Sequence, residues 1–508
     1  MVALTRTFMN QGGFTMTATT LEASGDTAME AVPEHYGQVG QVGQVGQVGQ
    51  VGQVEVAEVA EIGLAEPESA AGTEAAAQPV PLRRNRNFNL LWGGAVSALL
   101  GLSTADIAYP LVILALTGSP LKAGLFATVQ LIASVLATLP VGQLMDRKDR
   151  RRMLLLSESV RAAAAGSVAL AYFLGALTFW HLLLTAAALG AIQPFAGART
   201  LLLRQVVAPE QIPAALTAEQ VRQQGCELAG PPLGGAMFGI SRALPFVFAT
   251  IAGLVSLLTV VLLKLPKSVV SAAEHAENTE KSGNTENTER TGQREAADSP
   301  ESSHGGGGAL LGLKTIVRDP VMRATTLALC LVNTAGYPVF LSLVVRMQQN
   351  HAASGTTGLV VAGMALGGLG GTALVKPLHK LLRPGWLLIL ACLVFALTDF
   401  GMTLFTSPVA DAACLALGGA VIPSAVVMVN VLILQAVPDE QRGRTAAALE
   451  MFLLVGMPAG MLVSSAALQW FSPTATLLGL SLLMSVSVLY AASQKALRAA
   501  QWPDAQNA

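Results

Sequence analysis

Long apolar runs alternate with short polar intervals along most of this chain. Each run lasts roughly 20 residues, the length that an α-helix needs to cross a hydrocarbon core of ~30 Å. The pattern predicts an all-α membrane protein with twelve transmembrane helices. Their approximate ranges are 88–116, 121–141, 153–174, 178–202, 214–240, 244–264, 322–346, 356–377, 385–406, 410–435, 445–469 and 474–494.

Two polar segments divide the chain into parts. Gly37–Val54 consists of six Gly-Gln-Val copies, and the first 82 residues hold too few bulky apolar side chains to form a core. A second polar segment, which ends in four consecutive glycines, separates six predicted helices from six more. The expected parts are a disordered N-terminal tail at 1–82, a six-helix half at 83–265, a flexible linker at 266–313, a second six-helix half at 314–495 and a short tail at 496–508.

Lys and Arg residues gather in alternate loops between the predicted helices. One set of loops holds Arg83, Arg84, Arg86, the cations of 147–152, Lys264, Lys267, Lys314, Arg318, Arg323, Lys376, Lys380, Arg383, Arg442, Arg444, Lys495 and Arg498. The opposite loops hold little beyond Lys122, Arg242 and Arg346. By the positive-inside rule, both termini and the linker are expected in the cytoplasm, with the chain crossing the cell membrane many times.

Composition narrows the function classes. Only 12% of the 508 residues are charged, against about 25% in a soluble protein. The net charge of −1 gives no reason to expect a nucleic-acid partner. The chain has no Gly-x-x-x-x-Gly-Lys-Ser/Thr phosphate loop, and its four cysteines form no Cys-x-x-Cys pair. We therefore expect neither an enzyme nor an ATP-driven pump, and neither a cofactor nor a metal site.

The two groups of predicted helices repeat short stretches of sequence. Gln205–Gln211 reads Gln-Val-Val-Ala-Pro-Glu-Gln, and 435–441 reads Gln-Ala-Val-Pro-Asp-Glu-Gln. Some twenty residues later, the stretch Gly230–Gly235 has a weaker counterpart in Gly456–Gly460. Internal repeats of this kind are the basis of many secondary transporters.

The stretch Gly142-x-Leu-x-Asp146-Arg147-x-x-Arg150-Arg resembles the signature loop of the major facilitator superfamily. Gly230-Pro231-x-x-Gly234-Gly235 resembles the motif of its antiporter members. The segment from Asn87 to about Gly235 is similar to the drug- and siderophore-exporting branch, which includes macrolide efflux proteins. The resemblance implies a monomer with two six-helix pseudo-repeat halves around a central cavity.

The charged stretch Val141–Met153 is expected to be an aqueous loop. Gly142 has no side chain, so the helix before the loop can approach a neighbour closely. The N-terminus of the predicted helix 445–469 offers Asp146 free N–H groups and partial positive charge. The resemblance implies that this contact closes the cytoplasmic side, and we predict that Asp146, Arg147 and Arg150 form a gate latch. The alternative is that the loop only sets topology.

Two carboxylates are candidates for proton coupling. Asp106 lies near the middle of an apolar span, where a carboxylate is costly and usually faces a cavity or a partner. The alternative is a structural Asp106 bonded to Ser103 or to another helix. Glu227 is either a second protonation site or, as we prefer, the ion-pair partner of Arg222. In the same helix, Pro231 removes a backbone donor and introduces a bend.

Polar residues inside the helices that line the cavity of this superfamily are candidate substrate contacts. They are Asp106, Gln193, Asn333 and Asn430. Each amide has an alternative role as a hydrogen-bond partner of a neighbouring helix. Arg199 and Arg204 are expected at the membrane interface with their charges in the cytoplasm. The sequence gives no basis for assigning a function to Asp399.

The preferred function is export of a small amphipathic molecule, such as a drug, an antibiotic or a siderophore-like metabolite, which would give antibiotic resistance. The partners are this small molecule, the lipid bilayer and a coupling ion, which is a proton or alternatively sodium. A solute importer, or symporter, of the same fold is a second reading, against which the Gly230–Gly235 motif argues. A membrane sensor that transports nothing is a third, against which Asp106 argues.

Overall fold

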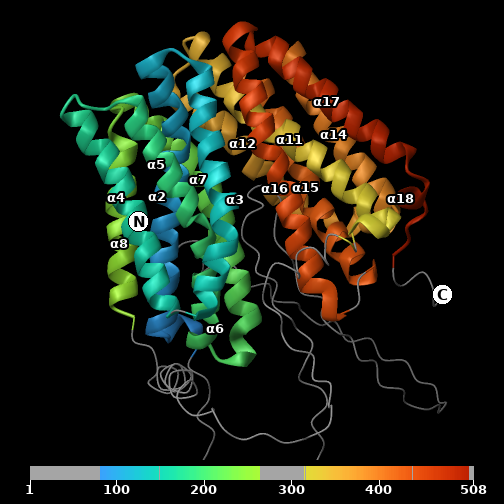
Figure 1. Cartoon of the computed structure of the whole chain (residues 1–508), viewed down its shortest axis with the longest axis horizontal. Coiled ribbons are helices and arrows are strands. Elements are labelled where there is room, and N and C mark those ends of the chain that lie inside the picture. The colour runs from blue at the N-terminus through green and yellow to red at the C-terminus, as the bar shows by residue number, and fades with distance from the viewer. Residues whose placement is uncertain (1–80, 148, 264–313, 315, 437–438, 503–508) are drawn as a thin grey trace, which may run out of the picture. The chain divides into compact units, whose positions relative to one another are not determined.

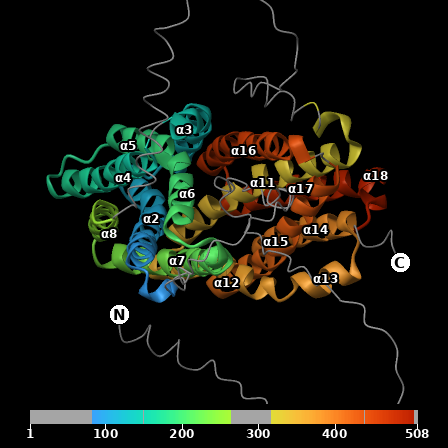
Figure 2. The same ribbon diagram turned by 90° about the horizontal axis from the view of Figure 1, so that it is seen from below.

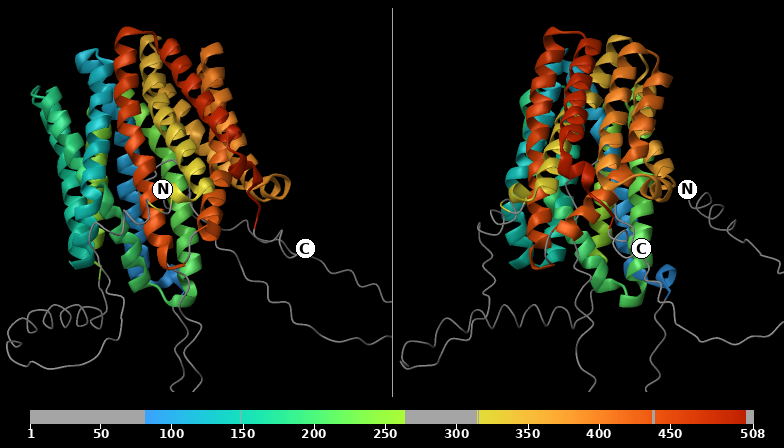
Figure 3. Two further views of the ribbon diagram at one scale, coloured as in Figure 1. Left: turned by 45° about the vertical axis from the view of Figure 1, so that its right-hand side comes forward. Right: turned by 90° about the vertical axis from the view of Figure 1, so that its right-hand side faces the viewer.

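The computed structural model describes residues 81–147, 149–263, 314, 316–436 and 439–502. All regular elements in these ranges are helices. The predicted tail 1–82, apart from its last two residues, and the whole predicted linker 266–313 lie outside the described residues. Figure 3 shows the long helices running in broadly one direction.

The helices before residue 264, here called the N-terminal helices, are labelled in Figure 1. They are η1 (Leu82–Arg84), α2 (Arg86–Thr117), α3 (Pro120–Arg147), α4 (Arg150–Phe173), α5 (Phe179–Ile192), η2 (Gln193–Ala196), α6 (Gly197–Val206), η3 (Pro209–Gln211), α7 (Ile212–Ile240) and α8 (Leu244–Val261). Within this group α2 packs on α7 and α8, α3 packs on α5, and α4 packs on α8.

The helices after residue 313 are here called the C-terminal helices. They are α11 (Pro320–Gln349), α12 (Ser354–Thr372), α13 (Val375–Leu381), α14 (Pro384–Leu404), α15 (Pro408–Ala436), α16 (Asp439–Trp470), α17 (Pro473–Ser493) and α18 (Lys495–Ala499). Within this group α12 packs on α15, α14 packs on α15 and α17, and α11 packs on α16 and α17.

Ten of the described helical segments are long and apolar enough to cross a membrane, or eleven if α12 and α13, which meet at a 63° bend, form one span. The chain is therefore a multi-pass membrane protein. The expected twelve spans included α7, a 29-residue helix that does not meet these criteria of length, hydropathy and charge. Three of its residues are charged, namely Glu219, Arg222 and Glu227.

The helix ends follow from local side-chain chemistry. The side chains of Asp319 and Ser472 accept hydrogen bonds from the first free N–H groups of α11 and α17, and both helices begin with proline. Asn85 caps α2 in the same way. Gly118, with φ of 62°, ends α2 in the left-handed conformation that glycine adopts most readily.

The charged stretch at 141–153 is mostly helical, so its expectation as a loop was wrong. α3 continues to Arg147, and α4 begins at Arg150. Asp149 stops the second helix from starting earlier, because its side chain accepts the Arg151 N–H at 2.8 Å as an N-cap. Most of the polar residues here therefore extend the two helices, and the chain between them is short.

Two other predicted helices are broken at prolines. The expected helix 178–202 divides into α5, the 3-10 turn η2 and α6, and Pro194 lies in that turn. The expected helix 356–377 ends as α12 at Thr372, and the chain then turns into α13. Pro377 cannot donate to the carbonyl of the preceding turn, which disfavours a straight continuation.

Glycines bring α12 and α15 into close contact. A Cβ built on Gly367 would lie 1.9 Å from the carbonyl oxygen of Ala416, and one on Gly371 would lie 2.2 Å from that of Ala420. No side chain fits between two backbones at this distance. The repeat of small residues every four positions therefore lets the two helices pack directly, as in many membrane bundles.

Candidate functional site

The N-terminal and C-terminal helices contact each other mainly along two helix pairs, with smaller contacts of α11 with α2 and α3. α3 lies beside α16, and α7 lies beside α12, as Figure 2 shows from below. In the first pair, the Ser119 hydroxyl before α3 donates to the Gln469 side chain at 2.8 Å. One turn further, a Cβ on Gly124 would lie 2.1 Å from the Cβ of Ser465. This contact lies at the start of α3, and the charged residues Asp146 and Arg147 lie at its other end.

The second helix pair uses the Gly230–Gly235 motif that the sequence singled out. A Cβ on Gly235 would lie 2.2 Å from the carbonyl oxygen of Ser354, at the start of α12. A Cβ on Gly358, one turn along α12, would lie 2.1 Å from the carbonyl oxygen of Pro231. The motif therefore supplies one side of the contact between α7 and α12.

The other two glycines of the motif face a different helix. A Cβ on Gly230 would lie 2.2 Å from the Cβ of Ser103 in α2, and one on Gly234 would lie 2.3 Å from the carbonyl oxygen of Thr104. The motif is thus a junction at which α7 packs on α2 and on α12 at once. Any movement of α7 relative to α12 takes place on this glycine surface.

The predicted gate latch lies at the opposite end of α3. Asp146 and Arg147 belong to its last turn, and their side chains lie outside the described residues; Arg150 begins α4 and is half-buried. No described atom lies within 4 Å of a Cβ built on Gly142. The side chains at the start of the helix 439–470 mostly lie outside the described residues, so the close approach at Gly142 and the contact of Asp146 with that helix stay predictions.

Asp106 lies on α2 between the two groups of helices and is half-buried. Its charge acts on Tyr109 in its own helix and on Tyr337 in α11, and the Arg161 charge from α4 acts on it. Within the described residues, Asp106 forms no ion pair and no hydrogen bond, so the alternative of a bond to Ser103 is not observed. The carboxylate is therefore placed near both helix groups without a direct partner.

A buried charge cluster joins α4, α6, α8 and α2. Glu158 is only 2% exposed. Arg199 donates to Glu158 Oε1 at 2.9 Å, to the Ser256 hydroxyl at 3.0 Å and to the Leu91 carbonyl at 3.0 Å. Arg161 approaches the same Glu158 oxygen at 3.5 Å.

The cluster overturns the expectation that Arg199 snorkels to the membrane interface. The side chain is 11% exposed, because it lies against Glu158, the Ser256 hydroxyl and the Leu91 carbonyl instead of facing water. One feature of the sequence could have indicated this cluster. Glu158 and Arg161 are charged residues within a predicted apolar span, where charges usually have a buried partner. The Arg204 side chain lies outside the described residues.

The expected ion pair between Arg222 and Glu227 was wrong. Arg222 pairs with Glu219, to which its Nε donates at 2.9 Å, and also donates to the Ala95 carbonyl at 3.1 Å. Residues three apart on a helix share a face, whereas Arg222 and Glu227, five apart, do not. Glu227 instead accepts from Gln223 at 3.1 Å and stays a candidate for protonation.

The three amides predicted to contact substrate have different surroundings. Gln193 begins the turn η2 between α5 and α6. Asn430 donates to the Val426 carbonyl of its own helix at 3.0 Å, which is a structural bond. Asn333 lines a cavity, and its amide nitrogen is buried without a hydrogen-bond partner in the described residues.

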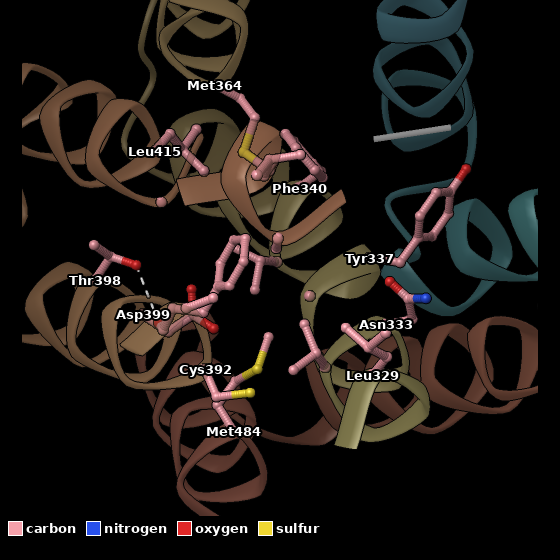
Figure 4. Close-up of a pocket in the computed structure, with 18 of the residues that line it drawn as sticks. Leu329, Asn333, Tyr337, Phe340, Met364, Cys392, Thr398, Asp399, Leu415 and Met484 are labelled. Carbon is pink, nitrogen blue, oxygen red and sulfur yellow. Dashed lines mark hydrogen bonds between the residues drawn. The ribbon is translucent and has the colours of Figure 1, made fainter. Parts of the chain in front are cut away.

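That cavity lies among the C-terminal helices and has a volume of about 100 Å³. Its walls come from α11, α12, α14, α15, α16 and α17 and are mostly apolar. Asp399, which the sequence left without a role, lines it from α14, and Figure 4 shows Asp399 and Asn333 on opposite sides. A cavity formed by six helices cannot be recognised from any one apolar run.

A second buried ion pair lies beside this cavity. Arg346 of α11 pairs with Asp411 of α15, and the two residues are 3% and 0% exposed. Arg346 also donates to the carbonyl of Met402, which lines the cavity. The sequence had placed Arg346 in a loop, and that placement was wrong because α11 continues to Gln349.

The fold is similar to solved structures of transporters. A bacterial homologue of the human lysosomal transporter Spinster, inward-facing and unoccupied, has a TM-score of 0.57 at 15% identity, over 82% of this chain and 96% of its own. A bacterial homologue of the iron transporter ferroportin, inward-facing, has a TM-score of 0.56 at 16% identity, over 82% and 100%. The nucleoside transporter NupG has a TM-score of 0.60 at 12% identity, over 81% and 100%.

At these identities the structural matches show the fold alone. No curated protein sequence matches this chain significantly. The sequence profile described as Major Facilitator Superfamily, however, matches residues 91–460, which is well over half of the chain. With the helical architecture and the transporter fold, this match shows that the chain belongs to the Major Facilitator Superfamily.

Proposed function

We propose that this protein is a secondary active transporter that exports a small amphipathic molecule across the cytoplasmic membrane by proton antiport. The cargo class is a drug, an antibiotic or a siderophore-like metabolite. The observation that carries the proposal is Asp106, a carboxylate inside a membrane span with no direct partner in the described residues. A group in this position suits a reversible proton carrier, because either protonation state can be accommodated without breaking an ion pair.

The proton step requires Asp106 to be reached from each side of the membrane in turn. When the site faces outward, the carboxylate takes up a proton; when the site faces the cytoplasm, it releases the proton and cargo binds. The position of Asp106 near Tyr337 supports this step, because Tyr337 belongs to the C-terminal helices and Asp106 to the N-terminal ones. Movement between the two groups would then change the surroundings of Asp106.

The proposed protein has twelve transmembrane helices in two six-helix halves, with α7 as one of the spans and both termini in the cytoplasm. Movement of one half relative to the other would open the site to each side of the membrane in turn. The contacts of α3 with α16 and of α7 with α12 support a closed outer end, since they lie far from the cations near Arg150. Asp146, Arg147 and Arg150 would close the cytoplasmic end in the other state. Both halves belong to one chain, so a monomer suffices.

The test is transport by the purified full chain in proteoliposomes with an imposed pH gradient and a panel of macrolides, lipophilic dyes and siderophores. At least one cargo should cross the membrane in the direction opposite to the flow of protons. Asp106→Asn should abolish proton-driven movement but retain exchange of cargo for cargo, and Asp106→Glu should keep part of the driven transport. Undiminished proton-driven transport by Asp106→Asn would reject the role of Asp106.

The same preparation separates the alternatives. Cargo that moves together with protons would indicate an importer, and movement that follows only a sodium gradient would replace the proton as coupling ion. A membrane sensor would move no cargo under any gradient.

A further inference from the structure

The cavity among the C-terminal helices holds one carboxylate that has no countercharge. Asp399 is 3% exposed, and its Oδ2 atom is buried without a hydrogen-bond partner in the described residues. The neighbouring Thr398 hydroxyl does not help, because it donates to the Phe395 carbonyl at 3.0 Å (Figure 4). A buried carboxylate in this situation is costly unless a proton or a cation neutralises it.

The nearby Asp411 shows how the same part of the fold treats a structural carboxylate. Asp411 is fully buried and is neutralised by Arg346. That arginine is committed, since it also donates to the Met402 carbonyl. Asp399 has no such cation, and it is the one of the two carboxylates that lines the cavity. A cation that neutralises Asp399 would therefore have to lie inside the cavity.

The walls do not suit calcium or magnesium and favour an organic cation. Calcium and magnesium take six or more oxygen ligands, and the described residues contain no group of three metal-binding side chains. The rings of Phe340 and Phe395 line the same cavity as Asp399, and aromatic faces attract organic cations. Met364 and Met484 add apolar, polarisable surface.

The volume limits the size of the occupant. An enclosed cavity of about 150 Å³ holds benzene, which has six non-hydrogen atoms, so by proportion a cavity of about 100 Å³ holds about four. We propose that this cavity is a binding site for a small alkylammonium ion, with its N–H groups directed at Asp399 Oδ2 and its alkyl body against Phe340 and Phe395. Asn333, on the opposite wall, offers a free amide donor for a ligand that also carries an acceptor atom. This proposal does not depend on the proposed export function, which rests on Asp106.

The test compares two probes of the same shape on the full chain in lipid nanodiscs. Isopropylammonium should bind measurably by calorimetry, and propan-2-ol, which lacks the charge, should bind at least tenfold more weakly. Equal binding of the two probes, or no binding of isopropylammonium, would overturn the proposal.

Two variants locate the site. Asp399→Asn keeps the side-chain shape but removes the charge, and it should weaken isopropylammonium binding at least tenfold. Gly418→Val should abolish binding by filling the cavity, because a Cβ on Gly418 meets Phe395 and Thr398 at ordinary contact distances of 3.4–3.5 Å. Asp149→Asn removes an exposed carboxylate that does not line the cavity, and it should leave binding unchanged. Unaltered binding to Asp399→Asn, or an equal loss in Asp149→Asn, would overturn the proposal.

Discussion

Gly235 of α7 and Ser354 of α12 join the N-terminal and C-terminal helices by direct backbone contact. The position of a Cβ on Gly235 lies 2.2 Å from the Ser354 carbonyl oxygen, which leaves no room for any side chain. Gly239 lies one turn further along α7, and no atom lies within 4 Å of its Cβ position. One helix therefore offers both a test position and a matched control.

Gly235→Ala should disfavour the conformation in which α7 and α12 touch. Overpacking a close contact costs about 1–3 kcal/mol, enough to change the ratio of two conformations about fivefold or more. Cross-linking between cysteines placed at Ser119 and Gln469, which are hydrogen-bonded in this conformation, should fall accordingly. Gly239→Ala should cross-link like the parent chain, and equal yields from the two alanine variants would contradict the gating role.

Asp146→Asn should weaken closure at the other end of α3. Loss of a carboxylate at a helix N-terminus costs about 0.3–1 kcal/mol, so we expect about two- to fivefold faster labelling of a cysteine placed at Gly142. A membrane-impermeant maleimide measures this rate.

Asp149→Asn is the matched control for the latch. It removes the same charge three residues away, and asparagine caps a helix as well as aspartate does, so α4 keeps its start. Equal labelling rates in the Asp146 and Asp149 variants would mean that this region only sets topology.

Arg346→Met should destabilise the chain strongly, because Asp411 is left buried without its partner. Removing one member of a buried ion pair costs about 3–5 kcal/mol. The double variant Arg346→Met with Asp411→Leu removes both charges and should regain most of that loss. Unfolding in a denaturing detergent measures each variant, and additive losses would show that the pair is not energetically coupled.

Glu158→Gln should be costly for the same reason in the N-terminal helices. Arg199 and Arg161 would lose their shared carboxylate, and we expect a loss of about 3–5 kcal/mol. The comparison is Arg152→Gln, which breaks an ion pair with Asp149 whose side chains are 80% and 51% exposed and should cost under about 1 kcal/mol. Similar thermal stability of the two variants would contradict the importance of burial.

Much of the fold could be predicted because membrane insertion depends on local composition. An apolar run of sufficient length forms a helix wherever it lies, so the apolar runs determined the multi-pass architecture. The motifs at Gly142–Arg150 and Gly230–Gly235 indicated the superfamily, which the match to residues 91–460 confirmed. Helix ends were predicted less well, since the caps at Asp149 and the breaks near Pro194 act over single turns.

The partners of buried charges were decided only by tertiary structure. Arg199 reaches Glu158 across 41 positions, and Arg346 reaches Asp411 across 65. Such pairs depend on where helices cross, which apolar content does not specify. Asp399 shows the same limit most clearly: its sequence neighbours do not indicate a role, and only the meeting of six helices gives this carboxylate a cavity to face.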